Sequence, residues 1–324
     1  MKRIRWGILG TGKIAHKFAT AMAQAKNVEL IAVGSRQEST AKAFADEFKI
    51  PHRHASYEAL VRDTDVDAIY VASLNTQHKD HTILCLNAGK AVLCEKPFAL
   101  NTRETEAMIQ TAREKKVFLM EAMWSRFIPA VVKAKELVLA GKIGEIRMLA
   151  ADFGFRGSDD PKNRVNDPAV GGSSMLDVGI YPLSLAQFLL GDHALMTSTA
   201  DIGPTGVDRA NAVVLQYNSG ALAVLSSAVN AVTIHEAFIS GTKGEIRIHA
   251  PWWRSERVTV YDNGKEIETF SMPHNTYAHE ADHVGDCLAA GLTESPVMPL
   301  DETRALMKTM DALRASWGIR YPGE

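Results

Sequence analysis

The chain has 324 residues, of which 46% are hydrophobic and 23% charged, with a formal net charge of -2 at pH 7. This length exceeds what one ordinary hydrophobic core serves, so two domains are expected. The composition is that of a folded globular protein, and the near-neutral charge argues against nucleic acid or an anionic membrane as the main partner.

The N-terminal segment does not resemble a signal peptide, because glycines at positions 7, 10 and 12 interrupt its apolar run. No stretch approaches the roughly 18 consecutive apolar residues of a membrane helix. The cysteines, Cys85, Cys94 and Cys287, lack metal-type spacing and are expected to be free thiols. These features predict a cytoplasmic protein without a membrane partner.

The first 120 residues alternate short apolar runs with segments of helical period. The runs are typical of strands buried on both faces, and they occupy residues 4–9, 30–33, 68–72, 91–94 and 117–120. The segment after Asn101 carries Glu104 three positions on, which resembles a capping box at a helix start. Repeated strand–helix–strand units predict an α/β fold with a doubly wound, Rossmann-type parallel sheet over residues 1–121.

The pattern changes in residues 122–324, where strand-like runs between 145 and 270 are joined by turns. Asp262-Asn263-Gly264 separates two such runs and is a strong hairpin signal. Near the C-terminus, apolar residues from Leu306 to Trp317 recur with the period of a helix and would lie on one face of it. We expect an α+β domain with an open, mainly antiparallel sheet for substrate binding and oligomerisation, whose C-terminal helices pack back on the first domain.

A G-x-G-x-x-A motif spans residues 10–15, between the first strand and the first helix. Gly10 permits a tight turn, and Gly12 lets a pyrophosphate approach the backbone. The helix start then offers free N–H groups and a positive dipole end to the phosphates. The motif predicts a dinucleotide site that includes Thr11, Lys13 and Ile14; a merely glycine-rich turn is the alternative.

The second strand ends at Ser35-Arg36, where an NAD site usually carries an acidic residue. A hydroxyl and a guanidinium favour a 2′-phosphate, which a carboxylate would repel. NADP(H) is therefore the preferred cofactor, with NAD(H) still possible. Alternatively, Arg36 is a solvated cation at the start of the next helix.

Glu95-Lys96-Pro97 follows the apolar run 91–94, which is expected to be a strand of the parallel sheet. The tripeptide then lies at the edge of the sheet where ligands bind. A partly desolvated ammonium at this edge interacts strongly with nearby charges, and Pro97 is compatible with a sharp or cis turn. Lys96 is the candidate catalytic cation; a purely structural cation is the alternative.

Asp177 and Tyr181 lie four residues apart in a helix-like segment that begins with Gly171-Gly172. A phenol near a cationic Lys has its ionised form favoured and can exchange a proton with a substrate hydroxyl. Asp177 could orient Lys96 or accept a substrate hydroxyl. A buried Tyr bonded to a capping Asp is the other interpretation.

With these three motifs in order, the whole chain resembles the Gfo/Idh/MocA oxidoreductase family (glucose–fructose oxidoreductase and inositol dehydrogenase type). Tyr181 and the segment 121–129 resemble the branch that contains dimeric dihydrodiol dehydrogenase and NADP-dependent D-xylose dehydrogenase. In that branch the Tyr is the proposed acid/base. The resemblance implies catalytic roles for Lys96, Asp177 and Tyr181, and a homodimer formed through the C-terminal sheet.

The resemblance also assigns further residues to the two ligands. It implies cofactor contacts, besides those of Glu95 and Lys96, from Leu74, Asn75, His78, Trp124 and Arg126. It also implies that Trp124 and Phe153 line the substrate site together with Lys96, Asp177 and Tyr181. Trp253, of the Trp252-Trp253 pair, is a weaker candidate for the same site.

Together these features predict an NADP-dependent oxidoreductase acting on a hydroxyl or carbonyl carbon of a sugar, polyol or cyclic trans-diol. A non-catalytic dinucleotide-binding sensor and an NAD-assisted glycosidase are the alternatives. His279-Glu280-Ala281-Asp282-His283 has the spacing of a helical two-His zinc motif. A hydrophilic helix start explains it better, so no metal site is expected.

Overall fold

The computed structural model describes residues 3–272 and 276–324. The chain forms two compact units, one of Met1–Trp124 with Thr276–Met307, the other of Ser125–Asn275 with Lys308–Glu324. The predicted boundary at residue 121 lies three positions before the observed division. Residues 276–307, from the C-terminal part of the chain, belong to the first unit.

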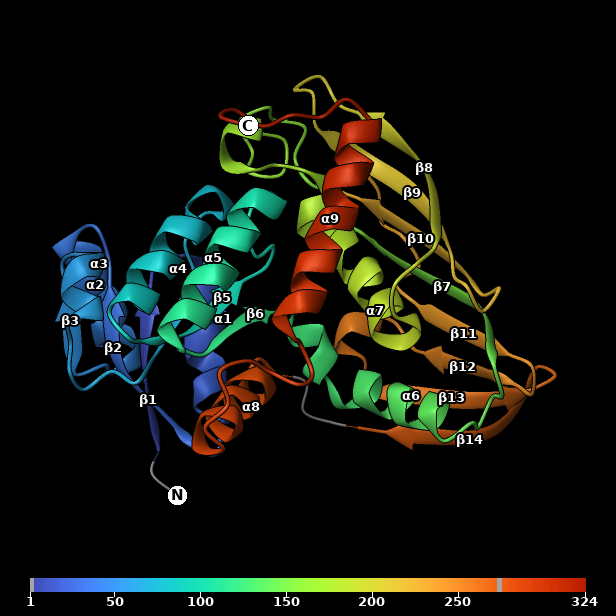
Figure 1. The fold of residues 1–324 in the computed structure, drawn as a ribbon, viewed down its shortest axis with the longest axis horizontal. Helices are drawn as coiled ribbons and strands as arrows, with labels where there is room; N and C mark the ends of the chain where they lie inside the picture. Colours follow the sequence, from blue (N-terminus) through green and yellow to red (C-terminus); the bar gives the residue numbers. More distant parts are fainter. Residues whose placement is uncertain (1–2, 273–275) are drawn as a thin grey trace. The chain divides into compact units, whose positions relative to one another are not determined.

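The first unit contains a six-stranded sheet with the order β3-β2-β1-β4-β5-β6 (Figure 1). All its strand pairs are parallel. This confirms the predicted Rossmann-type sheet, whose order reverses between β1 and β4, where such folds bind dinucleotides. The strands are β1 (Ile4–Leu9), β2 (Val28–Gly34), β3 (His52–His54), β4 (Ala68–Val71), β5 (Ala91–Glu95) and β6 (Leu119–Ala122).

Helices cover both faces of this sheet. Helix α1 contacts α2 and α8, and helix α4 contacts α3 and α5. Phe18 of α1 stacks on Tyr70 of β4 at a ring distance of 3.8 Å, so an apolar helix face closes the core. Asn101 caps α5 by accepting the N–H of Glu104, as its sequence predicts. The helices are α1 (Lys13–Met22), α2 (Glu38–Phe48), α3 (Tyr57–Val61), η1 (Asn75–Gln77), α4 (His78–Asn87), α5 (Thr102–Lys115) and α8 (Ala278–Ala289).

The second unit contains an eight-stranded sheet with the order β14-β13-β12-β11-β7-β10-β9-β8. The β7–β10 pair is parallel and the other pairs are antiparallel, which confirms a mainly antiparallel sheet. Asn263 and Gly264 take positive φ at the predicted hairpin between β13 and β14. The strands are β7 (Ile146–Gly154), β8 (Leu195–Ile202), β9 (Asp208–Gln216), β10 (Leu222–Ala228), β11 (Ala237–Gly241), β12 (Glu245–Ile248), β13 (Arg257–Asp262) and β14 (Lys265–Ser271).

Helices cover one face of the second sheet (Figure 1). α6 packs on β12 and β13, and α7 packs on β7 and β10. Residues alternate along the strands, so buried side chains face these helices and their neighbours face outward. The remaining elements are η2 (Trp124–Phe127), α6 (Pro129–Leu139), η3 (Pro168–Val170), the π-helical turn η4 (Met175–Gly179), α7 (Ile180–Leu190), η5 (Trp252–Arg254) and α9 (Leu300–Ser316).

Within the described residues, no helix has the length and apolar character needed to cross a membrane. The three cysteines are free and buried, as their spacing predicts.

Candidate active site

The β1–α1 turn has the geometry of a phosphate cradle. Gly10 has φ +104°, and a Cβ there would lie 2.8 Å from the carbonyl oxygen of Ala72, so only glycine fits. Gly12 begins α1, and a Cβ there would meet nothing within 4 Å. This open space before a helix N-terminus fits the pyrophosphate of a dinucleotide, which the amides of Lys13 and Ile14 would face.

A polar group lies beyond β2, where the adenosine ribose would bind. Ser35 is buried, and its N–H donates to the carbonyl of His54 on the edge strand β3. Arg36 is exposed and lies beside Tyr57, the first residue of α3; burial raises the pKa of Tyr57, and the guanidinium partly offsets this. The Tyr57 ring contacts His81 at 4.7 Å. Tyr57 and His81 were missed by the sequence analysis, because no motif links them to Arg36.

Lys96 follows β5 at the carboxyl edge of the sheet, and the Lys96–Pro97 peptide is cis. Its N–H donates to the Glu95 carboxylate at 3.1 Å, while the other Glu95 oxygen accepts a short hydrogen bond from the Tyr70 hydroxyl. Glu121 accepts the N–H of Phe98 at 3.1 Å. Buried carboxylates on both sides of the turn therefore hold the backbone that carries the half-buried Lys96.

His78 supports the same turn from α4. Its side chain is 1% exposed, and its ring nitrogens lie 2.8 Å from the carbonyl of Pro97 and 3.2 Å from that of Ser73. Burial lowers the pKa of His78 to about 4, so the ring is neutral at pH 7. The described contacts make His78 a support for the loops that end β4 and β5. Leu74, which is exposed, and Asn75 belong to the first of these loops.

Glu280, in α8, is a third buried carboxyl in the first unit. It is fully buried, and neither of its oxygens has a hydrogen-bond partner among the described residues. Burial and the nearby Glu95 raise the pKa of Glu280 well above its usual value.

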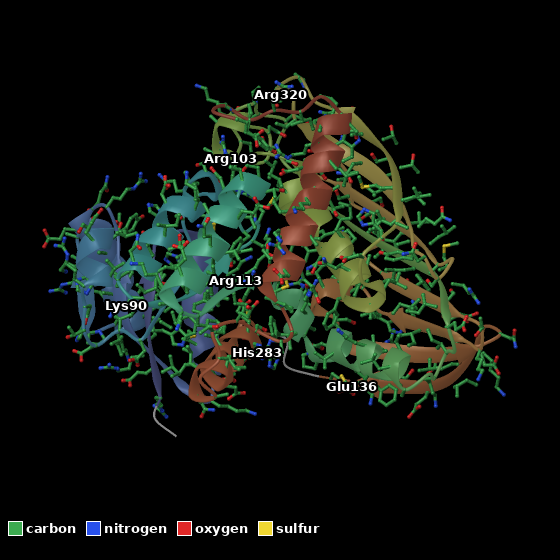
Figure 2. All side chains as sticks on the ribbon, viewed as in Figure 1. Lys90, Arg103, Arg113, Glu136, His283 and Arg320 are labelled. Atoms are coloured by element: carbon green, nitrogen blue, oxygen red, sulfur yellow. The ribbon has the colours of Figure 1, made fainter. Side chains whose placement is uncertain are left out.

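Two side chains of the His279–His283 segment on the same helix make contacts with other parts of the chain. The Nε2 of His283 lies 2.7 Å from the Ser295 hydroxyl, and Asp282 accepts the N–H groups of Lys26 and Asn27; Figure 2 labels His283 on α8.

In the second unit, Asp177 lies in the π-helical turn η4 and Tyr181 in the first turn of α7. Buried polar contacts anchor η4 on the sheet. Asp208 of β9 accepts from the Ser173 hydroxyl at 2.5 Å and from the N–H of Met175 at 2.8 Å. Both candidate residues are buried, at 9% and 6% exposure, so their orientation is fixed by packing.

Arg164 holds Asp177 in a two-pronged ion pair. Its two terminal nitrogens lie 3.1 and 3.0 Å from the two carboxylate oxygens. Burial alone would lower the pKa of Arg164, but the interaction with Asp177 outweighs it and raises that pKa. The sequence predicts Lys96 or a substrate hydroxyl as the partner of Asp177; Arg164 was not predicted, because it lies in an irregular loop without a recognisable pattern.

Aromatic side chains surround Tyr181. Phe153 of β7 lies edge-on to Tyr181 at 5.1 Å and stacks on Trp253 at 3.5 Å with nearly parallel rings. His235 completes the group, 4.8 Å from Trp253. The structure brings together three of the six residues predicted to line the substrate site, Tyr181, Phe153 and Trp253, and adds His235. Trp252 is fully buried, and its indole N–H donates to the main-chain carbonyl of Asp152. This hydrogen bond fixes the position of the adjacent Trp252 and Trp253.

The structure separates the roles of Trp124 and Arg126. Trp124 lies against Tyr277 at 4.5 Å in the first unit. Arg126 is 1% exposed in the second unit and donates to the Ser184 hydroxyl at 2.9 Å and to Gln187 at 3.1 Å, both on α7. These contacts anchor η2 to α7 through the guanidinium of Arg126, and its contact with the cofactor stays a prediction.

Comparison with known families identifies the chain's relationships. Residues 4–123 match the oxidoreductase family with an NAD-binding Rossmann fold, GFO_IDH_MocA, and residues 131–247 match the GFO/IDH/MocA C-terminal domain. The chain belongs to the Gfo/Idh/MocA family. It is therefore an oxidoreductase with a dinucleotide-binding Rossmann domain, as the three sequence motifs predict.

Individual members of the Gfo/Idh/MocA family are similar over almost the entire chain. Trans-1,2-dihydrobenzene-1,2-diol dehydrogenases from Mus musculus and Xenopus tropicalis are 37% and 36% identical, and the matches cover 98% of this chain and 98% and 99% of theirs. Aldose-aldose oxidoreductase from Caulobacter crescentus is 26% identical with a TM-score of 0.89, covering 98% of both chains. A 3-ketoreductase from Actinomadura kijaniata, solved with NADP and TDP-benzene, is 25% identical with a TM-score of 0.86, covering 97% and 98%.

Proposed function

We propose that this chain catalyses NADP(H)-dependent oxidation or reduction at a hydroxyl or carbonyl carbon of a cyclic trans-diol or a sugar. The observation that carries the proposal is the setting of Tyr181, beside the Phe153–Trp253 stack and near a carboxylate fixed by Arg164. A phenol supplies a proton-transfer group, and aromatic faces suit the apolar face of a ring substrate. The dehydrogenases 36–37% identical to the chain support a diol as the first substrate class to test.

In the proposed mechanism, the first unit binds the dinucleotide and the second unit binds the substrate. The bound nicotinamide would supply or accept the hydride. Lys96 would hold the reacting substrate oxygen and favour the ionised form of Tyr181. Tyr181 would take the hydroxyl proton during oxidation and return it during reduction. Arg164 would keep Asp177 ionised and oriented toward a substrate hydroxyl.

The test is an assay of the purified chain with NADP+ and a panel of trans-diols and aldoses, and with NADPH and the matching carbonyl compounds. Substrate-dependent appearance or loss of reduced nicotinamide would support the proposal. Tight dinucleotide binding without turnover on any member would favour a sensor. Release of oxidised NAD from the unfolded protein, together with glycoside cleavage, would favour the glycosidase alternative.

The preference for NADP(H) rests on the polar group beyond β2. Ser35 and Arg36 offer a hydroxyl and a guanidinium, and Tyr57 and His81 lie beside Arg36. Such a group binds a 2′-phosphate through charge-assisted hydrogen bonds. NAD(H) lacks this phosphate and should bind more weakly.

Replacing Arg36 with Gln should lower the ratio of kcat/KM for NADPH over NADH by about 10–100-fold, the usual worth of a hydrogen bond to a charged group. Steady-state kinetics with both cofactors would measure it. Arg53→Gln is the matched control, because Arg53 is an exposed arginine on the neighbouring strand β3 that faces Asp46. Equal ratios for Arg36→Gln and the wild type would remove Arg36 from cofactor selection.

We also propose a homodimer formed through the second sheet. Its outward face exposes large apolar side chains from adjacent strands, with Met148, Val224 and Phe238 each at least 40% exposed. Strand register aligns them, because Val224 and Phe238 both lie opposite Ala150 on β7. Patches of this kind are rarely left open in monomers, and a twofold axis would pair the face with its own copy.

We also propose a cytoplasmic location, which fits the three free thiols.

The double substitution Val224→Asp with Phe238→Asp should convert the dimer to a monomer, because each copy would bury two new carboxylates. Sedimentation velocity on wild type and variant would measure the change. Leu139→Asp is the control, since Leu139 is equally apolar and 76% exposed but lies at the end of α6. A wild type that sediments as a monomer would refute the dimer.

A further inference from the structure

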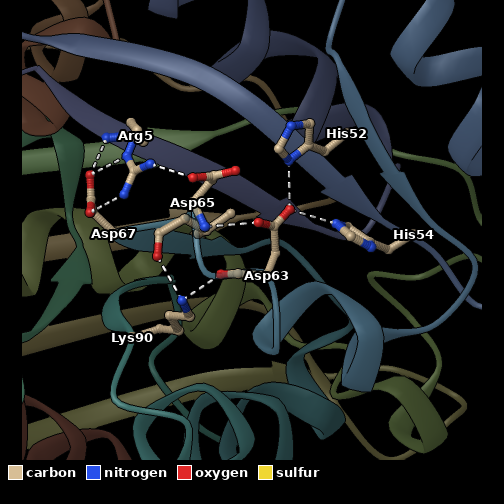
Figure 3. Close-up of polar contacts among 8 residues, drawn as sticks. Arg5, His52, His54, Asp63, Asp65, Asp67 and Lys90 are labelled. Carbon is tan, nitrogen blue, oxygen red and sulfur yellow. Dashed lines mark hydrogen bonds and ion pairs between the residues drawn. The ribbon is translucent and has the colours of Figure 1, made fainter.

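A group of metal-ligand side chains lies at the outer edge of the first sheet, outside the motifs that define the proposed active site. His52 and His54 are two residues apart on β3, so their side chains point to the same face (Figure 3). Asp63, which follows α3, lies on that face. The Nδ1 of His52 and the Nε2 of His54 lie 2.7 and 2.9 Å from the same oxygen of Asp63, and the three ligand atoms are within 4.8 Å of one another.

The carboxylate of Asp63 is held in place by other contacts. Its second oxygen accepts the N–H of Asp65 at 2.9 Å, and its main-chain carbonyl accepts from Lys90 at 2.6 Å. One oxygen of the carboxylate is therefore directed at both imidazoles.

We propose that His52, His54 and Asp63 bind a divalent transition-metal ion, with Zn²⁺ as the ion to test. Two imidazoles and one carboxylate are a donor set that suits Zn²⁺ and its first-row neighbours rather than Mg²⁺ or Ca²⁺. The His52 and His54 side chains are 36% and 21% exposed, so an ion and its remaining water ligands can enter from solvent.

Binding requires the three side chains to rearrange around the ion. Each ring would carry its proton on the nitrogen that faces away, and present a lone pair to the ion. Ligand atoms about 2.0 Å from a tetrahedral zinc ion lie about 3.3 Å apart, so each hydrogen-bonded pair must open by about half an ångström. Since the carbonyl of His54 accepts the N–H of Ser35, the ion would also brace the strand that supports Ser35.

The experiment is a calorimetric titration of chelator-treated, full-length protein with ZnCl₂, together with thermal unfolding with and without zinc. The wild type should bind about one zinc per chain and unfold at a higher temperature when zinc is present. His54→Gln and Asp63→Asn should each lose this binding and the temperature shift. His193→Ala, which removes a histidine from the turn before β8, should keep both.

Titration of the wild type with Co²⁺ gives a readout that does not depend on the folding of any variant. Visible absorption bands of a Co²⁺ ion with nitrogen ligands should appear and saturate at one equivalent, and Zn²⁺ should abolish them. No stoichiometric binding of either ion, or binding that is the same in His54→Gln and Asp63→Asn as in the wild type, would overturn the proposal. The three residues would then form only a hydrogen-bonded brace for β3.

Discussion

Replacing Tyr181 with Phe is expected to lower kcat by about 10²–10⁴-fold, which is the usual contribution of a positioned acid/base. The substitution removes only the hydroxyl, and the ring can keep its edge-on contact with Phe153 at 5.1 Å. The loss should therefore appear in kcat, with little change in the dissociation constant for NADPH. Steady-state kinetics and a fluorescence titration with NADPH would measure the two quantities.

Tyr217→Phe is the matched control for this substitution. Tyr217 is also a buried tyrosine of the second unit, 4% exposed, but it lies at the end of β9 and outside the aromatic group around Tyr181. Its variant should keep the wild-type kcat. A Tyr181→Phe enzyme with near-normal turnover on its best substrate would show that another group transfers the proton.

Replacing Lys96 with Met is expected to lower kcat/KM by about 10²–10³-fold, comparable to the loss of one donor to a reacting oxygen. Methionine keeps the length of the side chain and removes its charge. The ammonium is also proposed to favour ionised Tyr181, so the pH at which the oxidation rate is half-maximal should shift upward in the variant. The pH profile of kcat for the oxidation direction would measure this shift.

Lys42→Met controls for the loss of a positive charge, because Lys42 is an exposed residue of α2 that pairs with Asp46. It should leave both rate and pH profile unchanged. A lower rate in Lys96→Met with an unshifted profile would assign Lys96 to substrate binding alone, and unchanged kinetics would exclude it from the site.

The strands of the first sheet were largely predictable because apolar runs and glycine turns are local signals. β3 was missed, since His52-Arg53-His54 is short and polar and becomes a strand only by pairing with β2. The hairpin at Asn263-Gly264 was predictable because positive φ at both positions requires these residue types.

The candidate site was predictable only in part. Motif order in the sequence singled out Gly10, Lys96 and Tyr181, and a family resemblance added Phe153 and Trp253. Partners in irregular loops were missed, because a loop residue such as Arg164 or His235 carries no periodicity that reports its neighbours.

By itself, the sequence determined a Rossmann-type sheet with a dinucleotide cradle, a second, mainly antiparallel sheet, and the residue types available for hydride-transfer chemistry. Only the tertiary structure decided how polar side chains are paired. It joined Asp177 to Arg164, turned the ring of His78 toward two backbone carbonyls, and placed Arg126 against α7. The reason is physical: periodicity and turn chemistry depend on neighbours along the chain, whereas a buried polar group takes whichever partner the folded chain brings within hydrogen-bonding distance.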